Sequence, residues 1–333
     1  MIYARALGDA LRSSLERDPT VVILGEDIVD PYGGAFKVTR GLSTDFPDRV
    51  RATPISEGAL VGVCTGLAMH GYRPVVEVMF GDFLTLTFDQ IVNHAAKYPS
   101  MYDGQVRCPV IVRTPSGGGR GYGPTHSQSL EKHFLGIPHL RVAAASLLHD
   151  PDEVFAVLLR HDDPTLFIEH KLLYPLHLQT SADLDGLLVS RTTGRSGLPT
   201  VTLSAVPSGD CVLTVVAYGY QAALAAKLLE PLAVEEELFV ELVVPTQLAP
   251  PDWEPIERSV AATGALVTLE EGTAGWSWGT GIAEHIGRVA FGRLRRPPSV
   301  ATSAADIVPS AKHLEDEMIL GAAGVEQAIR DAA

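Results

Sequence analysis

The chain has 333 residues, 46% of them apolar, which is enough for two domains with proper cores. Its 40 acidic residues outnumber 26 basic ones, and the net charge of −14 disfavours nucleic acid or an anionic membrane as the main partner. A basic protein partner is permitted. Three cysteines without CxxC spacing indicate free buried thiols in a reducing cytoplasm. We expect neither a signal peptide nor a membrane span, which needs about 20 apolar residues.

Strands and helices alternate through the first half of the chain. An amphipathic helix at 3–17 comes first, and the apolar runs that follow indicate strands buried on both faces of a parallel sheet. The expected strands are 21–24, 74–80, 109–113, 141–146 and 166–169, and the expected helices between them are 57–71, 83–98 and 152–160. This alternation predicts a doubly wound α/β domain over residues 1–175.

The periodicity is lost between about residues 172 and 210, where Ser, Thr, Gly and Pro are mixed, and we assign 176–209 as an inter-domain linker. Alternation then resumes, which predicts a second, smaller α/β domain over 210–333. Its expected strands are 212–219, 238–243 and 265–270, and its expected helices are 221–229, 253–263, 281–287 and 324–333.

Glu57 lies in the first turn of the helix expected at 57–71, which is too apolar and glycine-rich for a surface helix. Gly58, Gly62 and Gly66 are four residues apart, so one helix face is bare and another backbone can approach it. A carboxylate that leads into such a helix is partly desolvated, holds a proton readily and can exchange it with a cofactor nitrogen. The alternative is an ordinary acidic residue at the positive end of a helix dipole.

Other residues at the ends of the expected strands are candidates for chemistry. Phe80 and Phe83 either belong to the core or hold a flat heterocycle by stacking. His126 follows a loop at the carboxyl end of a strand, where α/β proteins collect reactive groups, although a solvated histidine is equally compatible. The loop 117–121 lacks the spacing of a phosphate-binding loop, which favours a flexible surface loop over a lid.

The remaining patterns are mostly negative. No HxxxH or HExxH spacing supports a transition-metal site. The acidic pairs 162–163 and 270–271 favour solvated or helix-capping roles.

Several motifs together resemble the β subunit of the E1 component of 2-oxoacid dehydrogenase complexes, over nearly the whole chain. The motifs are Leu24-Gly25-Glu26-Asp27, the run 33–42 (GGAFKVTRGL), Thr53-Pro54-Ile55-Ser56-Glu57, Phe88-Asp89-Gln90-Ile91-Val92-Asn93, Ala95-Ala96-Lys97, His126-Ser127-Gln128-Ser129 and Leu269-Glu270-Glu271-Gly272. The resemblance implies a pyrimidine-binding transketolase-like domain for thiamine diphosphate, followed by a transketolase C-terminal-like domain.

The resemblance also implies roles for individual residues. Glu57 matches the glutamate that hydrogen-bonds N1′ of the cofactor's aminopyrimidine, and Phe80 and Phe83 match aromatic residues of the pyrimidine pocket. His126 matches the histidine that faces the cofactor's reactive end and the incoming lipoyl arm. The matching positions for a structural monovalent cation such as K⁺ are Val110, Leu158, Leu159, His161 and Asp163.

The sequence contains no Gly-Asp-Gly motif, which this family uses to hold Mg²⁺ and the cofactor's diphosphate. In the family that motif belongs to a separate α subunit, so the resemblance implies an α2β2 heterotetramer that is active only as the assembly. It further implies a 2-oxo acid substrate and docking to the E2 lipoyl acyltransferase. The second domain departs from the family's pattern at Thr246-Gln247-Leu248-Ala249 and at 306–312 (DIVPSAK), and both changes bear on the surface that docks E2.

Two alternatives stay open. One is half of a split transketolase-like or acyloin-forming enzyme of specialised metabolism, which would differ in its acyl acceptor. The absence of a basic phosphate-binding cluster argues against sugar phosphates. The other is a non-catalytic binding module of the same fold, in which Glu57 only caps a helix.

Overall fold

The computed structural model describes residues 1–180 and 182–333 and contains two sheets. The residues singled out above lie mostly after strands of the first sheet. Its order is β11-β5-β6-β4-β3-β1-β2, and every neighbouring pair is parallel except β11–β5. The strands are β1 (Val21–Gly25), β2 (Val50–Ala52), β3 (Arg73–Glu77), β4 (Ile111–Ser116), β5 (Arg141–Ala144), β6 (Thr165–His170) and β11 (Gln247–Ala249). The antiparallel strand β11 comes from the second half of the chain and ties the two halves together.

Helices cover both faces of this sheet. α1 (Tyr3–Arg17) and α6 (Pro151–Leu158) pack on one face, where Leu7, Leu11 and Leu15 of α1 are buried at helical spacing. α3 (Glu57–Met69) packs on the other face, in a core that also takes in residues of the second sheet. The shorter elements are α2 (Leu42–Asp45), α4 (Leu84–Asp89), α5 (Tyr98–Met101), the 3₁₀ turns Gly81–Phe83, Glu131–Phe134 and Ser208–Asp210, and the π-helical turn Gln90–Ala95.

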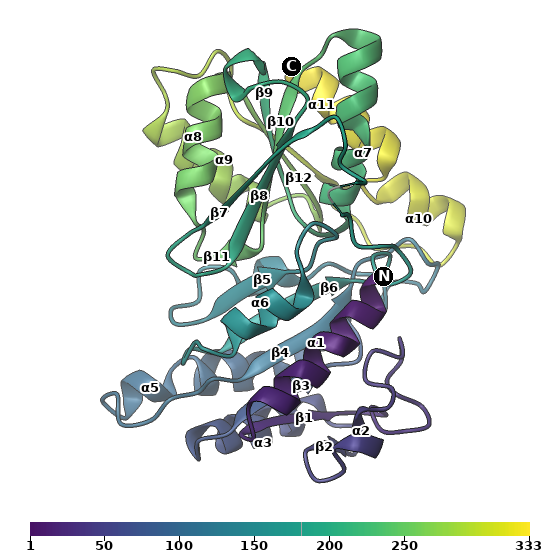
Figure 1. The fold of residues 1–333 in the computed structure, drawn as a ribbon, viewed down its shortest axis with the longest axis vertical. Coiled ribbons are helices and arrows are strands. Elements are labelled where there is room, and N and C mark those ends of the chain that lie inside the picture. Colours follow the sequence, from purple (N-terminus) through teal and green to yellow (C-terminus); the bar gives the residue numbers. More distant parts are fainter. Residues whose placement is uncertain (181) are drawn as a thin grey trace.

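The second sheet has the order β13-β12-β9-β10-β8-β7, with β8 and β7 antiparallel at one edge. Figure 1 shows this unit above the first. Its strands are β7 (Leu188–Thr193), β8 (Pro199–Ser204), β9 (Leu213–Ala217), β10 (Val240–Pro245), β12 (Leu266–Thr273) and β13 (Ser299–Ser303). Its helices are α7 (Gly219–Glu236), α8 (Trp253–Thr263), α9 (Trp278–Val289), α10 (Lys312–Met318) and α11 (Ala322–Ala332).

The predicted fold class, a doubly wound domain followed by a smaller α/β domain, is confirmed. The segment 176–209 that we assigned as a linker contains β7 and β8, both of which pair within the second sheet. The helix expected at 83–98 is divided, because a π-helical turn follows α4 and Pro99 begins a new short helix. The expected strands omitted the short or edge strands β2, β11 and β13. None of the described helices combines the length and apolarity that a membrane span requires.

Candidate active site

The carboxyl ends of the parallel strands place the candidate residues along one edge of the first sheet. Glu26 follows β1, Glu57 follows β2 and Phe80 follows β3. His126 lies in the long loop after β4, and Lys171 directly follows β6. Because parallel strands end on the same side, this edge is where an open α/β sheet builds a ligand site.

Two of the predicted aromatic residues and the predicted histidine contact one another. The His126 ring is edge-on to Phe80, with ring centres 4.7 Å apart, and to Phe83 at 5.3 Å. Phe36, which the sequence analysis did not single out, extends the cluster and lies 5.9 Å from Phe80. All four side chains are half-buried, so the cluster presents an aromatic surface instead of disappearing into the core.

Glu57 begins α3 and is 6% exposed. Its carboxylate makes no hydrogen bond to any residue that the structure describes, and the helix N-terminus has no side-chain cap. A second carboxylate lies nearby, because Glu26 accepts the Ser56 backbone N–H at 3.0 Å. Burial raises the pKa of Glu26, and the charge of Glu57 raises it further. Glu57 is thus mostly buried, and its carboxylate oxygens, which are not among the atoms sealed from solvent, are open to water or a ligand.

The glycine face of α3 behaves partly as expected. A side chain at Gly58 would meet the Leu86 backbone oxygen at 3.2 Å, so a neighbouring backbone does approach closely there. At Gly62 the neighbour is the Gln90 side chain at 3.0 Å. At Gly66 the space is open.

Lys171 is a site residue that the sequence analysis missed. It is 0% exposed, its Nζ donates to the His126 backbone oxygen at 2.7 Å, and the same nitrogen lies 5.3 Å from the centre of the Phe80 ring. Burial lowers the pKa of Lys171 to about 8. Its position directly after a buried strand is the signal that could have identified it.

The loop 117–121, for which a flexible surface loop was favoured, is instead buried at its start, half-buried over 119–121 and held by carboxylates of the second domain. Gly118 donates its N–H to Glu271 at 2.8 Å, and Gly119 and Gly121 donate theirs to Glu315 at 3.0 and 2.7 Å. Further along, the Gln128 side chain donates to Asp82 at 2.8 Å. The loop that leads to His126 therefore has a fixed path.

Glu271 corrects the expectation that the pair 270–271 is solvated or capping. Glu270 does cap α9, accepting the N–H of Gly279 at 2.6 Å, but Glu271 is buried and accepts from His170 Nε2 at 2.7 Å and Ser129 Oγ at 3.0 Å. The His170 Nδ1 accepts the Leu172 N–H at 3.1 Å, so its Nε2 carries the proton. Burial opposes ionisation of Glu271, but His170 and these donors hold its pKa at about 2.

The sequence also contains a GxSxG pattern at 275–279, which the sequence analysis overlooked and which lies at a turn from β12 to α9. Ser277 has φ −84° and ψ 169°, an ordinary extended conformation, and its side chain caps α9 by accepting the Thr280 N–H. A nucleophile elbow needs a strained, exposed serine that is paired with a histidine. Ser277 is buried and acts as a helix cap, so the pattern does not indicate a hydrolase.

The five positions matched to a monovalent cation lie around the end of α6, and most already have partners. The Val110 and Leu158 oxygens accept the backbone N–H of Thr165 and His161. The His161 oxygen accepts from Arg73 Nη1 at 2.9 Å, and Asp163 lies 3.6 Å from an arginine nitrogen. Leu159 completes the set. Arg73 already supplies positive charge here, so K⁺ would have to compete with a guanidinium.

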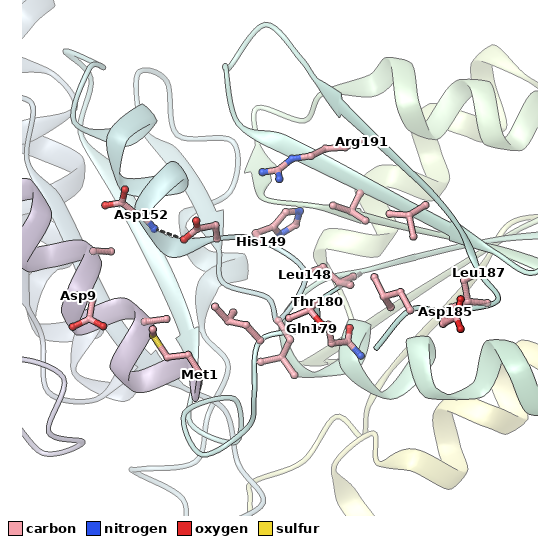
Figure 2. A pocket seen from close by; sticks show the side chains of 18 of the residues that line it. Met1, Asp9, Leu148, His149, Asp152, Gln179, Thr180, Asp185, Leu187 and Arg191 are labelled. Atoms are coloured by element: carbon pink, nitrogen blue, oxygen red, sulfur yellow. Dashed lines mark hydrogen bonds between the residues drawn. The ribbon is translucent and has the colours of Figure 1, made fainter. Parts of the chain in front are cut away.

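A cavity of about 810 Å³ lies away from this edge, between α1 and the start of the second sheet (Figure 2). His149 and Gln179 line it and have polar atoms without a hydrogen-bond partner, Nε2 and Oε1, but both atoms are sealed from solvent. A molecule in the cavity could not reach them. We therefore take the carboxyl edge, and not this cavity, as the candidate active site.

The chain matches two protein-family models in sequence. Residues 1–177 match the transketolase pyrimidine-binding domain, and residues 205–325 match the transketolase C-terminal domain.

Curated relatives cover almost the whole chain. The acetoin:2,6-dichlorophenolindophenol oxidoreductase subunit beta of Cupriavidus necator is 34% identical over 98% of this chain and 95% of its own length. The pyruvate dehydrogenase E1 component subunit beta of Leifsonia xyli is 38% identical over 88% of this chain and 83% of its own. The 3-methyl-2-oxobutanoate dehydrogenase subunit beta of Mycobacterium tuberculosis is 34% identical over 89% and 82%.

Solved structures share the fold. An inactive β4 tetramer of a split-gene transketolase aligns over 100% of this chain and 98% of its own, with a TM-score of 0.76 and 22% identity. Transketolase from Leishmania mexicana aligns over 99% of this chain and 44% of its own, with a TM-score of 0.65 and 18% identity.

Proposed function

The chain belongs to the family of E1 β subunits of 2-oxoacid dehydrogenases, and we propose that it carries the pyrimidine side of a thiamine diphosphate site shared with an α subunit. The reaction is oxidative decarboxylation of a 2-oxo acid, with transfer of the acyl group to the lipoamide of an E2 acyltransferase. When bound, thiamine diphosphate supplies the nucleophilic carbon and the electron sink that decarboxylation requires.

The observation that carries this proposal is the buried Glu57 carboxylate without a hydrogen-bond donor. Because no described residue pairs this carboxylate, it is available to hydrogen-bond a ligand at this edge of the sheet. A ring nitrogen of the cofactor's aminopyrimidine, which carries no hydrogen in its neutral form, would share a proton with this carboxyl group. Glu57 then holds a proton at that nitrogen and exchanges it during the reaction.

The half-buried rings of Phe80 and Phe83 fit a flat heterocycle, which they hold by stacking and edge contacts. His126 packs against both rings, so its imidazole lies where it can donate or accept a proton at the substrate. Lys171 holds the His126 backbone and does not need to touch the substrate.

The chain supplies only one side of such a site. It has no Gly-Asp-Gly motif, and its described residues form no group of three or more His, Cys, Asp or Glu side chains suited to a metal ion. Mg²⁺ and the diphosphate therefore belong to the α subunit, and the active assembly is α2β2. The relatives' names give three different substrates, acetoin, pyruvate and 3-methyl-2-oxobutanoate, so the substrate must be found by assay.

The test is co-expression with an α chain that carries the Gly-Asp-Gly motif. The purified complex is assayed with pyruvate, branched-chain 2-oxo acids and acetoin, using an artificial electron acceptor. We expect turnover that depends on both chains and on added thiamine diphosphate and Mg²⁺, and none from either chain alone. Turnover by this chain alone would contradict the shared site, and a complex inactive on every substrate would contradict the enzyme assignment.

A further inference from the structure

A carboxylate of the second domain fixes the loop that carries the reactive histidine. Glu315, in α10, is 0% exposed, and both of its oxygens accept backbone N–H groups of the loop. Oε1 accepts from Gly119 at 3.0 Å, and Oε2 accepts from Gly121 at 2.7 Å. Hydrogen bonds to an ionised carboxylate are roughly twice as strong as neutral ones. Two of them to one buried side chain fix both the position and the direction of the loop.

The held segment leads directly to His126. The loop packs closely against the residues before α10, since a side chain at Gly123 would lie 2.9 Å from Ser310 Oγ. Gly123 in turn accepts the His126 N–H at 3.2 Å. The His126 ring then contacts Phe80 and Phe83. An unbroken series of contacts therefore runs from Glu315 to the imidazole.

The neighbours of Glu315 on α10 do not share this role. Asp316 is exposed and pairs with Lys312 on the same helix. Glu317 is exposed, on the outer side of the helix. Of these three acidic residues, only Glu315 reaches the loop. Its side chain reaches the first domain, and the helix α10 does not need this contact for its own stability.

We propose that Glu315 is a positioning residue for His126, through which the second domain sets the histidine's orientation toward the cofactor. The proposal rests on the function assigned above to His126. Glu315 touches neither substrate nor cofactor in this account, and it acts only through the backbone of residues 119–126.

The first test needs no activity. Hydrogen exchange of the amides of residues 118–121 is compared in the full chain, in Glu315→Gln and in the matched surface control Glu317→Gln. The glutamine keeps one acceptor oxygen and turns its NH₂ toward the second N–H, so we expect Gly119 and Gly121 to exchange at least about tenfold faster, a change of about 1.4 kcal/mol in opening free energy. Glu317→Gln should match the wild type. Equal protection in all three proteins would overturn the proposal.

The second test separates positioning from general support of the fold. In the α–β complex, kcat is measured for Glu315→Gln, for His126→Ala and for the double variant. If Glu315 acts through His126, the single losses do not multiply and the double variant resembles His126→Ala. Multiplied losses would overturn the proposal. If Glu315→Gln does not fold, Glu315→Asp keeps the charge but shortens its reach, and the same comparison applies.

The two tests distinguish this inference from the proposed function. Faster exchange in Glu315→Gln together with an inactive wild-type complex would show that Glu315 fixes the loop and would refute the enzyme assignment. Unchanged exchange in Glu315→Gln together with an active wild-type complex would refute the positioning role of Glu315 and leave the enzyme assignment intact.

Discussion

Glu57 and Glu271 are buried to the same degree, 6% exposed each, in opposite surroundings. Glu271 accepts from the Gly118 N–H, the Ser129 hydroxyl and the His170 imidazole. Glu57 accepts from no group in the part of the chain that the structure describes. A buried carboxylate with a complete set of donors holds the structure together, whereas one without donors in its own chain is available to a ligand.

The presence or absence of hydrogen-bond donors therefore separates a structural carboxylate from a candidate ligand-binding one better than burial does. The two domains meet at Glu271, which belongs to the second domain and accepts hydrogen bonds from three groups of the first. Glu57 begins a helix at the edge of the sheet where a second subunit could meet it. His149 is an intermediate case, because Ser146 contacts its Nδ1 at 2.7 Å while its Nε2 has no partner and is sealed from solvent.

The largest effect is expected at Glu57. Glu57→Gln should lower kcat of the α–β complex by about a thousandfold, within the range for loss of a general acid–base group. The free energy of unfolding should be unchanged, because no described residue loses a hydrogen bond. Glu254→Gln is the control, since Glu254 also lies in the first turn of a helix but is exposed. Full activity of Glu57→Gln would contradict the role assigned to the carboxylate.

The converse is expected at Glu271. Glu271→Gln should lower the free energy of unfolding by about 3 kcal/mol, because three donors lose their ionised acceptor and the glutamine NH₂ faces one of them. The pKa of Glu271 is held at about 2, below the ordinary 4.5, so its contribution is present above pH 4.5 and is lost as the pH falls toward 2. Urea unfolding of this variant and of Glu317→Gln at pH 7 measures the difference. A decrease in unfolding free energy no greater than that of Glu317→Gln would contradict the structural role of Glu271.

A smaller, pH-dependent effect is expected at His149. Burial, helped by the charge of Arg191, lowers its pKa from 6.5 to about 3. Below pH 6.5 the unfolded chain binds a proton that the folded ring excludes. The free energy of unfolding therefore decreases as the pH is lowered, by up to about 1.4 kcal/mol per pH unit. His149→Leu should reduce the slope of unfolding free energy between pH 6.5 and 4.5, and the exposed control His313→Leu should not. An unchanged slope in His149→Leu would show that this ring does not titrate on unfolding.

The smallest effect concerns the matched cation positions. Because Arg73 donates to the His161 carbonyl, exchanging Na⁺ for K⁺ should leave the melting temperature of the wild type unchanged. Arg73→Met removes the competing charge, and K⁺ should then raise the melting temperature by about 2 °C. Thermal melts in matched salts test both statements. A K⁺-specific rise in the melting temperature of the wild type would show that these positions bind K⁺ despite Arg73.

Local patterns predicted most of the architecture. The helices 3–17 and 253–263 match the structure to the residue, because apolar spacing and clear ends define them. The edge strands β7 and β13 escaped notice because exposed or half-exposed strands lack a continuous apolar run. Strand β8 is buried, but Thr and Ser interrupt its apolar residues. Strand β11 joins a sheet formed by the other half of the chain, which no local pattern announces.

The site was predictable where its residues follow strands. Phe80, Phe83 and His126 come together as expected because strand ends converge. The roles of Glu271 and Glu315 were not predictable from local sequence. They reach the loop 117–121 from more than 150 residues away, and only the packing of the two domains brings them there.

The most direct measurement is a thermodynamic cycle on cofactor binding to the α–β complex. Thiamine diphosphate and an analogue with carbon in place of N1′ are titrated into wild type and Glu57→Ala. The account predicts that removing N1′ weakens binding to the wild type by about tenfold or more and barely affects binding to the variant, because the pair shares one hydrogen bond. An equal loss in both proteins would mean that Glu57 does not contact the cofactor ring.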